Sequence, residues 1–307
     1  MAKIVTLHHN IDIANGVLTK PGVVWGNNAL QTITIARHTP FNPQQAVGYK
    51  GIVDYTSSPV TSDLTLDCIL TEQSDTADTD TSVYKHADLE VKVGEESYVL
   101  TSCNINFQAG NPATVNYGYI TAGLASELAK LATEASVLTA GEEAQFAVVM
   151  GEDGKGVNIV ALNHTGAAFE IPAGAQTIGF TASMNRNQIL DVRSSSPVQF
   201  VTTYPLDLSV NLELLQKIVG TNLGSIELKP GASTSGLTTT ASGNRATGTG
   251  VNGNNGACTS FVKATGMKMT ESGESVNVGG NLTYTYNFTA ADILLPLAVS
   301  EGSNSNS

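Results

Sequence analysis

Five histidines are the residues of this chain best suited to hold a metal or act as a general base, and their spacing argues against both roles. His8 and His9 are neighbours in a strand-like stretch, so their side chains would point to opposite faces and could not easily share one ion. His38, His86 and His164 stand far apart in the sequence. None has a Ser, Cys or acid at a recognised motif spacing, although a triad assembled from distant residues stays open.

Carboxylates gather at residues 72–80 (EQSDTADTD), where they could attract calcium. The acids are Glu72, Asp75, Asp78 and Asp80. An EF-hand would also need a glycine at its turn and a closing glutamate, and neither is in register. A solvated loop explains this segment better.

Phosphate and thiol chemistry are equally poorly supported. Residues 151–156 (GEDGKG) lack the full P-loop pattern. Cys68, Cys103 and Cys258 have no CxxC or zinc-like spacing, so buried, reduced thiols and intracellular folding are expected. The sequence therefore predicts no enzyme, no cofactor and no metal site.

The net charge of the chain limits the kinds of partner that it can bind. The formal net charge is −12, from 27 acids and 15 bases, and no basic run is present to neutralise phosphates. Tight binding of nucleic acid is therefore disfavoured. The excess of acidic side chains is expected either to keep the protein soluble or to form a surface that repels a polyanion moving past it. Charged residues make up 14% of the chain, against about 25% in an average protein, which indicates that partners cover much of the surface.

Neither export nor a membrane span is expected, because the N-terminal region lacks an apolar stretch of signal-peptide length and no window of apolar residues reaches the length of a membrane helix.

Apolar and polar residues alternate with period two through most of the chain, which predicts half-buried antiparallel strands. The clearest strands lie at residues 31–36, 206–212, 275–278 and 282–288. Residues 146–150 and 157–162, which flank GEDGKG, are expected to form a hairpin.

Helical periodicity is confined to three segments. Leu124, Leu128 and Leu131 recur on one side of an expected amphipathic helix at residues 123–137. Shorter helices are predicted at residues 214–219 and 289–295.

Two passages of the chain resemble one another. Residues 55–69 align without gaps on residues 201–215, which matches Pro59 to Pro205 and Leu66 to Leu212. Upstream, residues 22–33 match 167–178; downstream, the run from Ser97 is aligned with the run from Ser260. Three matches in the same order predict a tandem duplication.

The repeat sets the expected domain organisation. Copy 1 is placed at residues 1–122, a linker helix and its connection at 123–143, copy 2 at 144–300 and a polar tail at 301–307. Copy 2 is expected to carry about 17 more residues than copy 1. The interval that holds the extra residues contains a Gly/Ser/Thr/Asn-rich loop at residues 231–257, whose composition cannot bury much apolar area.

Residues 183–215 (SMNRNQILDVRSSSPVQFVTTYPLDLSVNLELL) and 96–123 (ESYVLTSCNINFQAGNPATVNYGYITAG) resemble the tail tube proteins of tailed bacteriophages. In that family a Tyr-Pro leads into a long alternating strand, and a later Ser-Cys strand leads into a partner strand. Copy 1 departs from this pattern, since no Tyr precedes its Pro59.

The resemblance implies a mainly β fold, with two tandem tube-like sandwich or barrel domains and a short flanking helix in each. Strands of neighbouring subunits would join around a lumen. Since such rings present six domains, a chain with two domains would form a homotrimer with pseudo-sixfold symmetry.

Partners and location follow from the same resemblance. Other phage tail proteins would be partners, and viral DNA would pass without specific binding. The chain would fold in the host cytoplasm and reside in the virion tail. Loops 72–88 and 231–257 are expected to dock between rings, with contact candidates Glu72, Asp75, Asp78, Asp80, Leu237, Arg245 and Val251. Two alternatives stay open: another tail ring, such as a terminator or baseplate hub, and a glycan-binding β-sandwich module.

Overall fold

The computed structural model of this chain describes residues 3–8, 29–48, 50–57, 59–70, 81–86, 90–93, 96–125, 143–148, 157–193, 196–230, 261–276 and 280–295. Within these residues the protein is mainly β, which confirms the predicted fold class. The described residues contain one short helix, α1 (Val83–His86).

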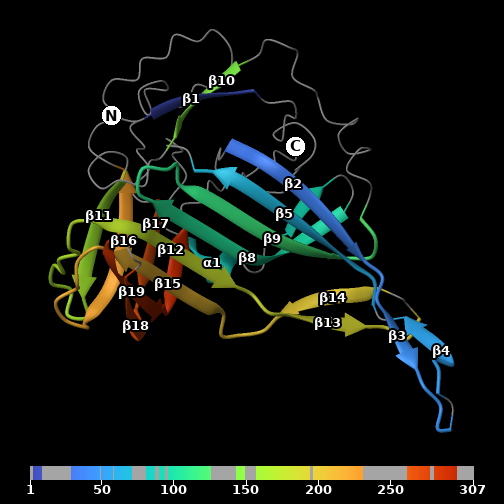
Figure 1. Cartoon of the computed structure of the whole chain (residues 1–307). Helices are drawn as coiled ribbons and strands as arrows, with labels where there is room; N and C mark the ends of the chain where they lie inside the picture. The colour runs from blue at the N-terminus through green and yellow to red at the C-terminus, as the bar shows by residue number, and fades with distance from the viewer. Residues whose placement is uncertain are drawn as a thin grey trace, which may run out of the picture.

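A nine-stranded antiparallel sheet runs through the molecule (Figure 1). Its strand order is β18-β19-β15-β12-β8-β9-β5-β2, and β7 pairs with one end of β8. In chain order the strands are β2 (Ala29–His38), β5 (Thr61–Ile69), β7 (Glu90–Val93), β8 (Glu96–Gln108), β9 (Thr114–Ala122), β12 (Ala175–Ser183), β15 (Asp207–Leu214), β18 (Lys268–Val276) and β19 (Leu282–Thr289). The sheet therefore joins strands from both halves of the chain.

A smaller sheet packs on one face of the large one. Its order is β11-β16-β17-β20-β6. The strands are β6 (Thr81–Ser82), β11 (Val157–Asn163), β16 (Leu223–Pro230), β17 (Val262–Thr265) and β20 (Asp292–Leu295). Because β6 comes from the first half of the chain and pairs with β20, this sheet also ties the two halves together.

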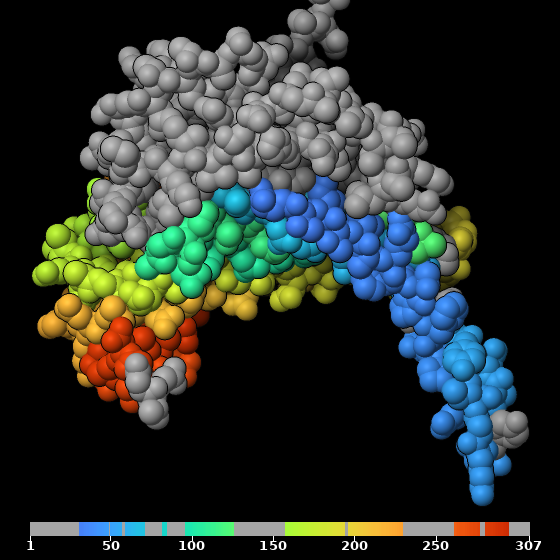
Figure 2. All heavy atoms as spheres, turned by 45° about the horizontal axis from the view of Figure 1, so that its top comes forward, coloured from blue at the N-terminus to red at the C-terminus, as the bar shows by residue number. Residues whose placement is uncertain are grey.

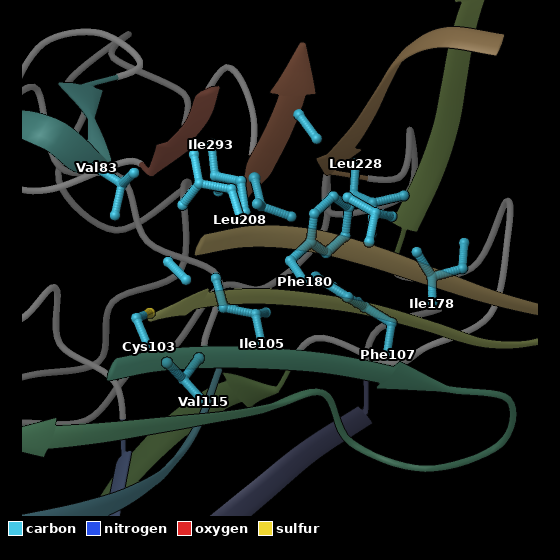
Figure 3. Close-up of a cluster of buried hydrophobic side chains, with 14 of the residues drawn as sticks. Val83, Cys103, Ile105, Phe107, Val115, Ile178, Phe180, Leu208, Leu228 and Ile293 are labelled. Atoms are coloured by element: carbon cyan, nitrogen blue, oxygen red, sulfur yellow. The ribbon is translucent and has the colours of Figure 1, made fainter. Parts of the chain in front are cut away.

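The core lies between the two sheets (Figure 3). Phe107 of β8 meets Phe180 of β12 edge to face, with ring centroids 6.4 Å apart, and lies 6.5 Å from the ring of Phe261. Leu228 of β16 and Ile293 of β20 reach the same core from the smaller sheet. The arrangement is a β-sandwich, in which the apolar faces of two sheets interdigitate.

Alternation along each strand produces this core. In β5 the side chains of Leu64, Leu66 and Cys68 are buried, and the residues between them are partly exposed. The pattern recurs in β15, where every second side chain from Leu208 to Leu214 is buried. Successive side chains of a strand point to opposite faces, so these strands present one apolar and one polar face.

The two halves of the large sheet share one strand order. The order β2-β5-β9-β8 in the first half corresponds to β12-β15-β19-β18 in the second, and β8 pairs with β12 where the halves meet. β-Bulges lie at matching places. Gln31 and Gln176 interrupt the first strand of each half, and Thr101 and Thr270 interrupt the last. We use these bulges to equate residues between the halves.

Each half also carries a hairpin between its first two sheet strands. In the first half this is β3 (Phe41–Gln44) with β4 (Asp54–Ser57), and in the second it is β13 (Arg186–Leu190) with β14 (Pro197–Thr202). We call these hairpins the arms. Figures 1 and 2 show the β3–β4 arm projecting well beyond the sheet. A separate two-stranded sheet pairs β1 (Lys3–His8) with β10 (Glu143–Val148).

Two helix predictions are wrong. Residues 215–222 form irregular turns after β15, because the Ile218 side chain is buried against the sheet and its amide donates to the Tyr286 hydroxyl at 3.0 Å. Residues 292–295 form β20, where Ile293 lies opposite Ala264. Sheet contacts override the weak local helical pattern in both places. Most of the predicted 123–137 helix lies outside the described residues.

The hairpin expected around GEDGKG is also wrong. β10 pairs with β1 and β11 pairs with β16, so the two segments do not pair with each other. The buried Val157 and Ala161 of β11 belong to the core of the smaller sheet. A turn-like composition between two strands therefore did not determine their partners.

The third sequence match has the wrong register. It equated Val99 with Val262, but Val262 lies in β17 of the smaller sheet, whereas the matching bulges equate Thr101 with Thr270. At this strand the residue numbers of equivalent positions in the two halves therefore differ by 169, where the sequence match predicted 163. At Leu66 and Leu212 they differ by 146, so the second half has 23 additional residues between these strands instead of about 17. Both stretches alternate alike, so the pattern could not tell one sheet from the other.

Candidate functional site

The two halves meet at a strand pairing that we call the internal seam. Along it β12 and β8 pair antiparallel from Thr177 opposite Gln108 to Ser183 opposite Ser102. Backbone hydrogen bonds extend the pairing beyond both ends: Ala109 N donates to Gln176 O, and Met184 N donates to Thr101 O, each at 2.8 Å.

A side chain from the second half reinforces this seam. Arg186, at the base of the β13–β14 arm, donates from Nε to the carbonyl oxygen of Leu100 at 2.9 Å and also bonds the Thr202 hydroxyl. A guanidinium that bonds a backbone carbonyl and a hydroxyl fixes the arm against the first half of the sheet.

The large sheet ends in two strands that we call the open edges, β2 and β18. Within the described part of the chain, each pairs with a single strand, β2 with β5 and β18 with β19. β2 is the counterpart of β12 and β18 the counterpart of β8. The open edges are therefore the same two strand positions that meet at the internal seam, and they lie at opposite ends of the large sheet, as the labels β2 and β18 in Figure 1 show.

The open edge at β18 is far more polar than its counterpart. Where β8 buries Cys103, Ile105 and Phe107, β18 carries Ser272, Glu274 and Val276, all exposed. Glu274 lies 3.4 Å from Lys217 in an exposed ion pair, which contributes little to stability. Charged residues on an edge strand protect a free chain from indiscriminate strand pairing.

The face of the large sheet opposite the core is polar, and we call it the polar face. Its acids come from β5, β15 and β18, and they are Asp63, Asp67, Asp207, Glu213 and Glu271. Several are held by neutral partners: Asn116 donates to Asp67, and Asn287 donates to Glu271 at 3.1 Å. The remaining positions are mainly Thr, Ser, Asn and Gly, and Lys268 lies on the same face.

The arms gather exposed apolar side chains. Of the fifteen large apolar residues exposed in the described part of the chain, ten lie on the arms: Phe41, Val47, Ile52, Val53, Tyr55, Ile189, Leu190, Val192, Val198 and Val201. Concentrations of apolar surface of this kind typically mark places where another molecule docks.

The described thiols are buried and suited to packing. Burial, and secondarily the charge of Asp67, raises the pKa of Cys68 from its ordinary value of 9.0 to about 12. Burial, and secondarily Cys68, raises the pKa of Cys103 to about 12. Both are free thiols, and protonated thiols in a core are poor nucleophiles.

The predicted inter-ring contacts cannot be placed. All of these candidates, and the thiol Cys258 as well, lie outside the described residues; the candidates are Glu72, Asp75, Asp78, Asp80, Leu237, Arg245 and Val251. The repeat-equivalent residues are described: Leu66 and Leu212 are buried at matching positions of β5 and β15, and Pro59 and Pro205 precede those strands.

Sequence reasoning missed the open edges and the arms. The edges depend on strand order, which alternation alone does not reveal. The arms could have been predicted, since the interval between the first two strands of each half is long and contains apolar residues.

Among the described residues no cluster of three or more His, Cys, Asp or Glu could hold a metal, and none of the helices there has the length and apolarity of a membrane span.

Comparisons with known proteins give no family assignment: no family model and no curated protein matches the chain.

Proposed function

We propose that this chain is a structural subunit of a bacteriophage tail tube, in which three copies close into a ring and the rings stack into a hollow conduit for DNA. The observation that carries the proposal is the repeated sheet, whose two halves join at the internal seam and whose end strands β18 and β2 each pair with a single strand in the described part of the chain. Joining β18 of one chain to β2 of the next would repeat that seam around a closed ring.

Strand physics favours such closure. An open sheet edge presents unpaired backbone groups that invite another strand, and full closure removes the edge. A head-to-tail contact that rotates by a fixed amount closes into a ring. Eight of the nine strands lie side by side in the large sheet, and β7 lies off this path at one end of β8. Three chains with these eight strands each would give a barrel of 24 strands, made of six four-stranded units.

The polar face suits the inside of such a barrel. Its Thr, Ser and Asn side chains hydrate well, and its five acids repel the phosphates of DNA, so DNA would slide without adhering. The core side of the sheet would face outward, beneath the smaller sheet.

The arms supply a candidate stacking contact between rings. They carry the largest share of the exposed apolar side chains, and the β3–β4 arm reaches beyond the sheet end (Figure 2). Residues 72–80 and 231–257 would add to this contact. Residues 81–86 of the expected loop instead form β6 and α1, where Val83 is buried in the core. The assembled tube would belong to the virion tail, alongside other tail proteins, after the chain folds in the host cytoplasm.

Electron microscopy of the purified chain, with its mass in solution, tests the proposal. We expect rings of three 31.9 kDa chains with a sixfold outline, some of them stacked into tubes. A chain that stays monomeric at high concentration contradicts it. Rings that never stack would point to a terminator or baseplate-hub ring.

A glycan-binding module is the second candidate, favoured by the exposed Phe41 and Tyr55 of the β3–β4 arm, since aromatic rings stack on sugars. Binding on a glycan array by a chain that does not self-associate would support it over the tube.

A further inference from the structure

We infer that β18 of one chain pairs antiparallel with β2 of a second copy in one defined register, with Val276 opposite Ile33 and Ser275 opposite Thr34. This inference rests on the proposed ring and adds to it the residues that meet. It is derived from the internal seam, which serves as the template for the contact between chains.

The bulges fix which residues correspond. Gln31 and Gln176 are equivalent bulge residues, so positions in β2 and β12 differ by 145. Thr101 and Thr270 are equivalent bulge residues, so positions in β8 and β18 differ by 169. Pairings on the neighbouring strands give the same result, since Leu66 faces Tyr117 as Leu212 faces Tyr286.

Applying the residue pairing of the internal seam to the two open edges gives the register between chains. In the template Phe107 lies opposite Ile178 and Asn106 lies opposite Gly179. Adding 169 to the β8 number and subtracting 145 from the β12 number places Val276 opposite Ile33.

The same shift places Ser275 opposite Thr34, Glu274 opposite Ile35 and Glu271 opposite His38.

Two of the pairs in this register bring together side chains of like character. Val276 is 67% exposed in the single chain, and pairing would bring it against the half-buried Ile33 on the core side of the sheet. Ser275 and Thr34 would meet on the polar face, where small hydroxyl side chains fit directly opposite each other.

The template also predicts which backbone groups bond across the contact. The bonds from Ala109 and Met184 show that every second pair along the seam is hydrogen-bonded, and Phe107 with Ile178 is one of these. Val276 and Glu274 should therefore direct their N–H groups toward the partner copy. Ser275 with Thr34 falls between them, at a non-hydrogen-bonded pair.

Engineered disulfides test the register. A non-hydrogen-bonded antiparallel pair brings Cβ atoms to about 4.5–5.5 Å, within reach of a disulfide, whereas a partner two residues away lies at about 7–8 Å. We would combine Thr34→Cys with Ser275→Cys in a Cys258→Ser background, keeping the buried Cys68 and Cys103. Positions 34 and 275 lie at opposite ends of one chain's sheet, so a bond between them must join two chains.

The matched control is Thr32→Cys with Ser275→Cys, which shifts one partner by two residues on the same face. Oxidised rings should give covalent dimers and trimers on denaturing gels for the first pair, and none for the control. Rings that cross-link through the control pair, or through neither pair, would overturn the register while leaving the proposed ring intact. Absence of rings from the unsubstituted chain would overturn the proposed function, and the inference with it.

Discussion

Leu66 and Leu212 occupy the same place in the two halves of the large sheet. Leu66 is 1% exposed and lies opposite Tyr117, and Leu212 is 0% exposed and lies opposite Tyr286. Both side chains point into apolar cores. Their equivalence could be predicted from the sequence, because the alternating pattern and the aligned proline blocks are local features.

Truncating either leucine should therefore have the same effect. We expect Leu66→Ala and Leu212→Ala each to lower the free energy of unfolding by about 2–5 kcal/mol, through lost burial and the cavity left behind. Urea unfolding followed by circular dichroism measures this. The matched controls Thr65→Ala and Asn211→Ala, one position earlier on the polar face, should change it by about 0.5 kcal/mol or less. A tolerated alanine at only one leucine would argue against equivalent packing.

The buried thiols give the fold a dependence on alkaline pH. Unfolded thiols lose their protons near their ordinary pKa of 9.0, whereas Cys68 and Cys103 hold theirs to about 12 in the fold. The unfolded chain thus binds fewer protons than the folded chain in this range, and stability falls as pH rises.

We expect the free energy of unfolding to decline between pH 9 and 12, less steeply in a Cys68→Ala, Cys103→Ala variant than in the natural chain. Native-state alkylation at pH 8 should leave both thiols unmodified until denaturant is added. Equal slopes for the two proteins, or rapid native alkylation, would show that these thiols are accessible.

At the scale of elements, β18 combines the geometry of a joining strand with the chemistry of a protected edge. Its counterpart β8 finds its partner within the same chain, so it can be apolar. In the proposed ring β18 would have to stay soluble until a second copy arrives, which would account for Glu271 and Glu274 on this strand.

Proline at position 274 should separate folding from assembly. By the seam template the Glu274 amide points away from β19, so Glu274→Pro removes an N–H that only the partner copy would use. We expect a folded monomer by circular dichroism and no rings by light scattering. Glu274→Ala, which keeps the amide, should still form rings. Normal rings from the proline variant would mean that β18 is not the joining strand.

The arms should act on stacking and not on ring closure. Val47 and Val192 lie in the turns of the two arms with their side chains fully exposed, so Val47→Asp with Val192→Asp should not affect folding. We expect closed rings but much shorter tubes in micrographs, because desolvating a carboxylate opposes an apolar contact. Val219→Asp, an exposed position outside the arms, is the control. Tubes of normal length from the arm variant would exclude the arms from stacking.

Element type could be predicted from the sequence more easily than element partners. The strands around residues 31–36 and 282–288 follow from period two alone. The failed helix at 214–219 and the failed hairpin around GEDGKG depended on distant contacts, such as that of Ile218 with Tyr286. The sequence match assigned the wrong equivalent to the last strand of the first half for the same reason. It selected β17, which alternates as well as β18 but belongs to the smaller sheet.

At the scale of the whole molecule, one seam explains both the joining of the halves and the proposed joining of chains. A chain that carries two units would already contain every second contact of the proposed ring. Because each intermolecular association costs roughly 4–15 kcal/mol in lost freedom, a ring of three chains assembles with fewer such losses than a ring of six.

A cryo-electron microscopy reconstruction of the assembled particle tests the central claim most directly. The account predicts three chains in a closed barrel of 24 strands, with β18 of each chain hydrogen-bonded to β2 of the next and Asp67 and Glu213 facing the bore. A particle in which β18 and β2 stay unpaired, or in which the polar face points outward, would contradict it.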